Sequence, residues 1–137
     1  MSHEINCLII DDEEIVLKSC RKIFEAEGFD VVTTANPQEG LKLVSETSFD
    51  VILVDWMMPG FDGMDVVEEI DRRSPNSAVV MISGFPTVGR ATEAMKRGAM
   101  DYVAKPFKPK RSPWLSKRRS GGRSPKRKRP SVDLKGL

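Results

Sequence analysis

The hydrophobic positions of the chain form five short runs in which apolar and polar residues do not alternate. Most residues in these runs are aliphatic or β-branched. Strands of a parallel sheet have this pattern because helices cover both of their faces. We therefore predict five buried parallel strands, at residues 5–10, 31–34, 51–54, 78–82 and 101–104.

The segments between these runs have the spacing of amphipathic helices, with apolar residues three or four positions apart. Gly28 is a typical stop after the first helix, and Asn36-Pro37 is a good cap and first position for the second. The apolar positions that mark the four predicted helices are Val16, Cys20, Ile23 and Phe24; Leu41 and Val44; Met64, Val67 and Ile70; and Val88, Ala91, Met95 and Gly98.

Strands and helices alternate along the chain, which is the order of consecutive βαβ units. Such units connect in a right-handed sense, and their helices cover both faces of a parallel sheet. The sequence therefore predicts the α/β fold class, as a doubly wound parallel sheet. In such a sheet, ligands bind beyond the carboxyl ends of the strands, at the point where the strand order reverses.

Polar side chains follow the predicted strands at this edge. Asp11 and Asp12 follow the first strand, and Asp55 follows the third. Ser83 follows the fourth strand, and Lys105 follows the fifth. If the strand order is 2-1-3-4-5, the first and third strands are neighbours. Three carboxylates then meet at one edge of the sheet, beside a hydroxyl and an ammonium group.

Three close carboxylates repel one another and raise one another's pKa, and a hard divalent cation relieves this repulsion. Magnesium prefers one or two carboxylates and takes its other ligands from water and substrate phosphate. A carboxylate can also attack phosphorus and form an aspartyl phosphate. Lys105 could then pair with a phosphoryl oxygen while Ser83 donates a hydrogen bond to another. The group of residues fits the capture of a phosphoryl group.

Four segments of the chain resemble the receiver domain of two-component response regulators, the CheY-like family, in order and in spacing. The resemblance covers about residues 4–107. It implies a flavodoxin-like five-stranded sheet of order 2-1-3-4-5, and phosphorylation of Asp55 by a sensor histidine kinase or a phosphotransfer protein. The matching segments are LIIDDEE (8–14), VILVDWMMPGFDG (51–63), VVMISGFPT (79–87) and DYVAKPF (101–107).

The resemblance also implies roles for individual residues. Asp12, Asp55 and the backbone carbonyl of Met57 match magnesium ligands, and Asp11 matches a residue that supports the metal through water. Lys105 and Ser83 match residues that contact the phosphoryl group, and Ser83 and Tyr102 match a pair that forms the switch.

Some of these residues also fit plainer roles. Ser83 fits the cap of the fourth helix, and Tyr102 fits a core position of the last strand. Trp56, Met57 and Phe85 border the site and fit simple packing. Their bulk could also obstruct a water molecule that attacks the acyl phosphate, so we predict slow self-dephosphorylation.

Charge divides the chain into two parts. Residues 1–107 hold 10 Lys and Arg against 19 Asp and Glu, a formal charge of −9. Residues 108–137 hold 12 Lys and Arg against one acid, a formal charge of +11. We therefore predict a receiver domain at 1–107 and a basic tail at 108–137, rich enough in Pro, Gly and cations to be disordered. The fifth helix of the family is expected to be absent or disordered, because the tail has no sustained apolar period.

Three interpretations of the tail remain open. It could contact nucleic acid or another acidic surface through its cations, in a salt-dependent manner. It could be a solvated segment without a partner, or a segment foreign to the ancestral domain. The interface that many relatives form through their fourth and fifth helices cannot be assumed here, so the oligomeric state also stays open.

Composition limits the other functional classes. The length suits one domain, and no apolar run approaches the roughly 20 residues that a membrane helix needs. Without a recognisable signal peptide, we expect a cytoplasmic protein that does not contact membranes. Cys7 and Cys20 are expected to be reduced core residues, because neither lies in a metal-binding or redox motif.

A phosphorylation switch would not be a metabolic enzyme, because its chemistry would be confined to its own aspartate. Two other functions compete with it. A magnesium-dependent phosphatase with an aspartyl nucleophile commonly has a second acid two positions later, and here that position is Met57. A nucleic-acid-binding protein would use the tail, but the chain has no helix-turn-helix or zinc motif for reading bases. The switch, acting on a downstream target protein, is therefore the preferred interpretation.

Overall fold

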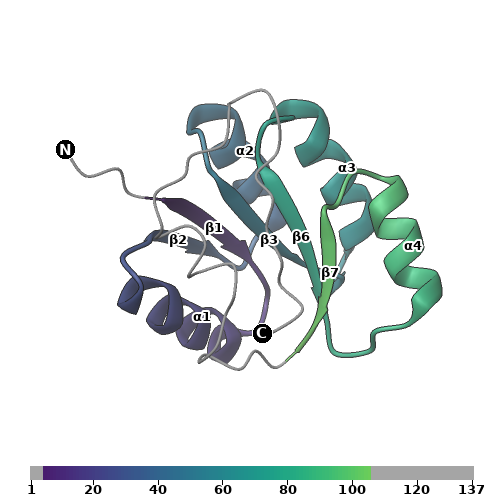
Figure 1. Cartoon of the computed structure of the whole chain (residues 1–137), viewed down its shortest axis with the longest axis horizontal. Coiled ribbons are helices and arrows are strands. Elements are labelled where there is room, and N and C mark those ends of the chain that lie inside the picture. Colours follow the sequence, from purple (N-terminus) through teal and green to yellow (C-terminus); the bar gives the residue numbers. More distant parts are fainter. Residues whose placement is uncertain (1–4, 106–137) are drawn as a thin grey trace.

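The computed structural model describes residues 5–105, which form a five-stranded parallel sheet with helices on both faces (Figure 1). The strand order is β2-β1-β3-β6-β7, which is the predicted order 2-1-3-4-5 once a separate two-stranded hairpin is set aside. The elements are β1 (Asn6–Ile10), α1 (Glu14–Ala26), β2 (Asp30–Thr34), α2 (Pro37–Glu46), β3 (Val51–Asp55), β4 (Met57–Met58), β5 (Phe61–Asp62), α3 (Gly63–Arg73), β6 (Ala78–Ser83), α4 (Val88–Lys96) and β7 (Asp101–Ala104).

The strand register explains the predicted meeting point of the side chains. Ile10, the last residue of β1, pairs with Thr34 of β2 and with Val54 of β3. Asp55 at the end of β3 pairs with Ile82 of β6. The parallel strands therefore end at one edge of the sheet, and the α/β fold class predicted from the sequence is confirmed.

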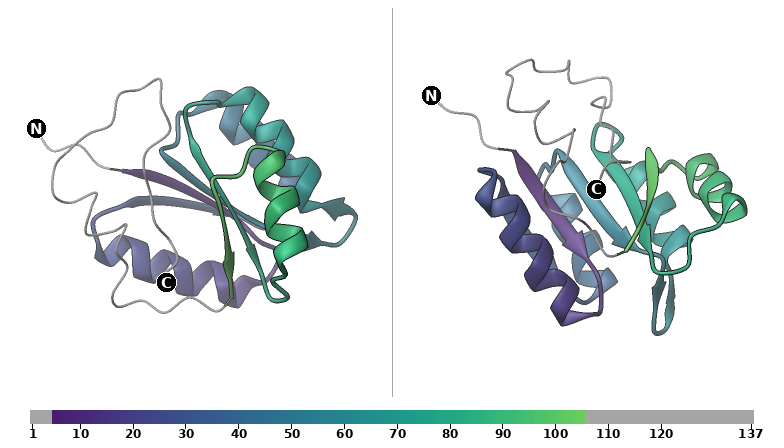
Figure 2. Two further views of the ribbon diagram at one scale, coloured as in Figure 1. Left: turned by 45° about the vertical axis from the view of Figure 1, so that its right-hand side comes forward. Right: turned by 60° about the horizontal axis from the view of Figure 1, so that its bottom comes forward.

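Successive strand residues point to opposite faces of the sheet and divide the core in two. On one face, residues such as Ile9 and Leu53 pack against Phe24 and its neighbours on α1. On the other face, residues such as Ile10 and Val54 pack against α2, α3 and α4. Figure 2 shows this division, with α1 on one side of the sheet and the other three helices opposite.

Local signals in the sequence fix the ends of the helices. Gly28 follows α1 with φ of 92°, in the left-handed region that favours glycine. Asn36 caps α2, because its side-chain oxygen accepts a hydrogen bond of 2.8 Å from the Gln38 N–H. Cys7 and Cys20 are buried free thiols, and burial raises the pKa of both, so neither is a reactive group.

The fourth predicted helix is present as α4, but it ends at Lys96, before the predicted position Gly98, and its buried face differs from the predicted one. Val88 and Met95 are 83% and 43% exposed, whereas Ala94 is fully buried. The helix lies at the edge of the sheet, where it packs against β7 (Figure 1), so only a narrow strip of it is covered. Thr87 caps the helix by accepting the hydrogen bond from the Arg90 N–H, so the plainer role of Ser83 as this cap does not apply.

The loop after β3 contains a hairpin, β4 and β5, that the sequence did not predict. It turns at Gly60, which has φ of 80°. The hairpin projects from the end of the sheet at which β1 and β3 stop (Figure 2). Gly63 begins α3 directly against the β3 end, and a Cβ there would lie 2.5 Å from the Asp55 carbonyl oxygen.

The expected absence of the family's fifth helix and the predicted basic tail both concern residues outside the described range. Within residues 5–105, none of the helices combines the length and the apolar character needed to span a membrane.

Candidate functional site

The edge of the sheet brings the predicted site residues together through the backbone. Asp11 directly follows β1, and its N–H donates to the Thr34 carbonyl at 3.2 Å. Asp55 is the last residue of β3. Lys105 directly follows β7, and its N–H donates to the Ser83 carbonyl at 2.9 Å. These positions depend on strand pairing and not on flexible loops, which holds the functional groups in place.

Three carboxylates form an acidic cluster at this edge. One carboxylate oxygen from each of Asp11, Asp12 and Asp55 lies within 4.8 Å of the others. Asp11 is fully buried and Asp55 is 4% exposed, whereas Asp12 is open to solvent. The cluster thus has two buried members and one exposed member.

Lys105 is the cation of the cluster. Its Nζ lies 3.0 Å from Asp11 Oδ2, 3.2 Å from Asp55 Oδ1 and 2.9 Å from Glu13 Oε1. Burial alone would lower the Lys105 pKa, but the hydrogen bond to Glu13 and the negative charges of Asp11 and Asp55 outweigh it and raise the pKa. Lys105 is therefore a fixed positive charge at the site.

The cluster disfavours the charged form of its buried acids. Burial raises the pKa of Asp55 from an ordinary value of 3.8 to about 7; the Asp11 charge adds to the rise, and Lys105 opposes it. Burial also raises the pKa of Asp11, against the hydrogen bond from the Glu13 N–H and the pairing with Lys105. One ammonium group does not fully compensate these carboxylates.

The residues fit a magnesium ion. Asp11 Oδ2 is buried without a hydrogen-bond partner among the described residues, because its contact with Lys105 has the distance of an ion pair but not hydrogen-bond geometry. Asp12 offers an exposed oxygen from the same side. Oxygen ligands of this kind, with one side open for water and phosphate, suit a hard divalent cation.

The acidic cluster opens into a cleft of about 380 Å³. Ser83 and Lys105 line it together with Asp12 and Asp55, and so does Met57, whose backbone carbonyl was the predicted third metal ligand. Phe85 lies at the rim and is 69% exposed. Six of the seven predicted residues therefore meet at this site, five lining the cleft and Asp11 beneath it.

Tyr102, the seventh predicted residue, does not line this cleft. Its ring packs, half-buried, against the core on the side of α3 and α4. Its hydroxyl is buried and has no hydrogen-bond partner within residues 5–105. Ser83 Oγ accepts a hydrogen bond from the Phe85 N–H at 2.9 Å, which shows how it is held in this arrangement.

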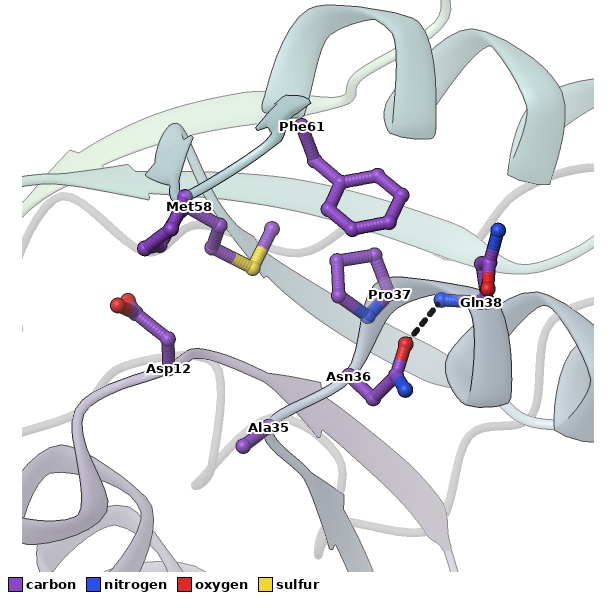
Figure 3. A pocket seen from close by; sticks show the side chains of 8 residues that line it. Asp12, Ala35, Asn36, Pro37, Gln38, Met58 and Phe61 are labelled. Atoms are coloured by element: carbon purple, nitrogen blue, oxygen red, sulfur yellow. Dashed lines mark hydrogen bonds between the residues drawn. The ribbon is translucent and has the colours of Figure 1, made fainter.

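A second cleft lies on the other side of Asp12 and has a volume of about 290 Å³. Figure 3 shows its apolar lining, with Phe61 of the hairpin facing Pro37 at the start of α2 and Met58 beside them. The cap hydrogen bond between Asn36 and Gln38 closes its far end. Asp12 stands between the two clefts, which explains its exposure.

Two groups at the site were missed in the sequence. Glu13 pairs with Lys105, and its position directly after Asp11-Asp12 was the available signal. Arg90 lies over the Trp56 ring, with its guanidinium carbon 3.8 Å from the ring centroid. No spacing in the sequence pointed to this second contact, because it joins α4 to the end of β3.

The fold and the acidic edge define a class of protein, and comparison with known proteins agrees with it. The sequence model of one protein family, the response regulator receiver domain, matches residues 7–112 of this chain. The chain therefore belongs to the response regulator receiver domain family, as the sequence motifs indicated. Receiver domains of this family are signalling phosphoacceptors of two-component systems.

Individual relatives support the assignment. An NtrX-like response regulator of Rickettsia bellii is 36% identical over 133 residues, which is 96% of this chain and 27% of the relative. The chain thus spans about a quarter of that relative's length. A CheY-like receiver domain protein of Methanospirillum hungatei superposes with a TM-score of 0.77 at 27% identity, over 86% of this chain and 93% of that one.

A solved structure with a modified aspartate is also similar. It is a response regulator protein of Burkholderia pseudomallei with a phosphorylated aspartic acid, a calcium ion and citrate. It superposes with a TM-score of 0.73 at 25% identity, over 85% of this chain and 72% of that one.

Proposed function

We propose that this chain accepts a phosphoryl group on Asp55, with magnesium bound, and that the modification switches its binding to a downstream protein. The single observation that carries the proposal is the position of Asp55 Oδ1. It lies 3.2 Å from Lys105 Nζ, and one oxygen of the Asp55 carboxylate lies within 4.8 Å of carboxylate oxygens of Asp11 and Asp12, in the lining of an open cleft.

The proposed step is the transfer of a phosphoryl group from the phosphohistidine of a sensor kinase or phosphotransfer protein. An Asp55 carboxylate oxygen attacks phosphorus, the phosphorus–nitrogen bond breaks, and the imidazole leaves with its electron pair and takes up a proton. Lys105 then pairs with a phosphoryl oxygen, at the position where it now pairs with Asp55 Oδ1. The buried position of Asp55 excludes most water around the new acyl phosphate.

Magnesium would be held by Asp12, Asp55 and the Met57 carbonyl directly, and by Asp11 through water. When bound, it supplies positive charge that neutralises the phosphoryl oxygens and the acidic cluster. The raised pKa of Asp55 supports this role, because a cation at the cluster favours the ionised nucleophile.

The proposed readout begins at Ser83. Its hydroxyl lines the cleft and can turn toward the phosphoryl group. This turn would break the hydrogen bond that Ser83 Oγ now accepts from the Phe85 N–H. Movement of residues 84–87 then reaches α4, whose exposed Val88 and Met95 are available to a partner. Tyr102 is proposed to follow Ser83, since its hydroxyl has no partner in the present arrangement of residues 5–105.

Slow self-dephosphorylation is part of the proposal. Trp56, Met57 and Phe85 all line the cleft, and bulky side chains at its mouth hinder a water molecule that approaches phosphorus. Substituting Met57 by Asn should shorten the lifetime of the phosphorylated protein, because it replaces an apolar side chain by one that can orient water. An unchanged lifetime would contradict this part of the proposal.

Intact-mass measurement tests the phosphoacceptor directly. The protein is incubated with acetyl phosphate, with and without magnesium, beside Asp55→Asn and Asp30→Asn variants. Asp30 is an exposed acid at the start of β2 and serves as the matched control. We expect a magnesium-dependent gain of one phosphoryl group in the wild type and the control, and none in Asp55→Asn. Phosphorylation of Asp55→Asn would overturn the proposal.

A further inference from the structure

Trp56 is held firmly beside the proposed acceptor. Its N–H donates to the Ile82 carbonyl at 2.9 Å, and its carbonyl accepts from the Gly63 N–H at 2.8 Å. The ring is half-buried and packs against the core on the side of α2 and α3. Trp56 directly follows Asp55 and lines the cleft, so this packed ring forms part of the cleft wall.

Arg90 in the first turn of α4 connects this surface to the loop at residues 84–87. Its guanidinium carbon lies 3.8 Å from the centroid of the Trp56 ring. The Nη1 of the same group donates to the Phe85 carbonyl at 2.6 Å. A planar guanidinium can stack on a ring and donate in its own plane at once, which a lysine cannot do.

The backbone of Phe85 is therefore held at both its N–H and its carbonyl. Its N–H donates to Ser83 Oγ at 2.9 Å, and its carbonyl accepts from Arg90. Thr87 caps α4, but the loop itself is open to solvent: residues 84–87 are exposed, and the Phe85 side chain is 69% exposed. If Ser83 turns toward a phosphoryl group, the loop loses one of these two contacts and the Arg90 contact becomes the main restraint.

We propose that Arg90 is a positioning residue that latches the loop to Trp56 in the unphosphorylated protein and so sets how readily the switch responds. This inference rests on the proposed function, because it concerns the regulation of the same site. The latch favours one of two arrangements of the loop. A ligand that binds the other arrangement must first displace this equilibrium. Its apparent affinity is therefore lowered by the factor by which the latch favours the latched arrangement.

The test uses the full chain with Trp114→Phe, which leaves Trp56 as its single tryptophan. Arg90→Met removes both guanidinium contacts but keeps an unbranched side chain of similar helix propensity. Arg90→Lys keeps the charge and loses the planar fork. Lys96→Met, at the exposed end of the same helix, is the matched control. Each protein is titrated with beryllium fluoride in magnesium, and the apparent dissociation constant is taken from Trp56 fluorescence.

We expect beryllium fluoride to bind Arg90→Met about five- to fiftyfold more tightly than the wild type, the range for losing a cation–π contact and a hydrogen bond. Arg90→Lys should give a smaller change, and Lys96→Met none. In the absence of beryllium fluoride, amide hydrogen exchange of residues 84–90 should be faster in Arg90→Met, with exchange in β1 unchanged. A merely structural role would lower thermal stability without tightening the binding.

The outcomes separate this inference from the function on which it rests. A normal wild-type response with an equal or weaker affinity in Arg90→Met overturns the latch alone. Unchanged exchange of residues 84–90 in that variant also overturns it. The absence of any wild-type response to beryllium fluoride overturns the proposed function and the latch together.

Discussion

The two walls of the cleft are built differently. On one side, which we name the acidic wall, Asp11, Asp55 and Lys105 stand at the ends of paired strands and contact one another at about 3 Å through Lys105. On the other side, the loop wall, residues 84–87 are exposed and connect β6 to a helix that covers only the sheet edge. Phosphoryl chemistry requires groups fixed in advance, whereas a switch requires a segment of low local stability.

The difference also appears in how each wall is held. The acidic wall depends on the sheet, whose central strand β3 is buried along its entire length. The loop wall depends on a few side-chain contacts, those of Ser83, Thr87 and Arg90. Changes in the acidic wall should therefore affect the chemistry, and changes in the loop wall should affect the readout.

The largest expected effect comes from removing the cation of the acidic wall. Lys105→Met leaves Asp55 without its partner at 3.2 Å and removes a charge that would stabilise the transferred group. The rate of phosphorylation by acetyl phosphate should fall by about a hundredfold, as for loss of one preorganised electrostatic contact. Intact-mass time courses measure this rate. Lys96→Met should be unaffected, and equal rates in both variants would contradict the role of Lys105.

A pair of glycine substitutions compares the packing of the two helix starts beside the walls, Gly63 of α3 next to the acidic wall and Gly89 of α4 next to the loop wall. In Gly63→Ala the new Cβ would lie within 2.7 Å of backbone atoms of Asp55 and Trp56, so β3 or α3 must shift. We expect a loss of about 1–3 kcal/mol in the free energy of unfolding. In α4, a Cβ at Gly89 meets nothing within 4 Å, and Gly89→Ala should gain up to about 1 kcal/mol. Urea denaturation of both variants checks the opposite signs.

The acidic wall also predicts a pH dependence. The Asp55 pKa is about 7 in the folded protein against an ordinary 3.8, so between these values the folded chain keeps a proton that the unfolded chain has released. Without magnesium, this group therefore contributes stability at low pH that is lost as pH rises through that window. Magnesium must displace the same proton, so its affinity should be about tenfold weaker at pH 6 than at pH 8.

Calorimetric titration with magnesium at the two pH values measures this dependence, and urea denaturation without the metal measures the change in stability. In Asp55→Asn, the pH dependence that this carboxyl gives to the magnesium affinity and to the free energy of unfolding should disappear. A magnesium affinity that is equal at pH 6 and pH 8 in the wild type would contradict the raised pKa.

Sequence reasoning performed differently on the two walls. The acidic wall could be predicted, because continuous apolar runs such as 51–54 locate strands, and the residue after each strand must lie at the common edge. The loop wall could not. The contact between Arg90 and Trp56 joins segments that are distant in the sequence, and no periodicity encodes it.

The fourth helix illustrates a further limit. Its apolar spacing predicted that Val88 and Met95 would be buried, yet the helix buries Ala94. Periodicity shows that a helix forms, but how much of it is covered depends on where it lies on the sheet. Thr87, which the sequence pattern did not single out, caps this helix, and residue type alone could not have separated it from Ser83 because both hydroxyls suit a cap.

The smallest expected effects come from two helix caps. Asn36 caps α2 beside the acidic wall, and Thr87 caps α4 in the loop wall. Replacing either by Ala should lower the free energy of unfolding by about 1 kcal/mol. Only Thr87→Ala should change the apparent affinity for beryllium fluoride, because it loosens the loop wall. A change of equal size in Asn36→Ala would erase the distinction between the walls.

The most direct test of the two-wall account is a residue-by-residue comparison of amide NMR shifts in the magnesium-bound protein with and without beryllium fluoride. We predict large shifts across residues 83–90 and along α4, together with the local shifts expected beside Asp55. The cores of β1 and β2, which lie away from the loop wall, should keep their shifts. Shifts confined to the immediate surroundings of Asp55, with residues 84–90 unchanged, would contradict the account.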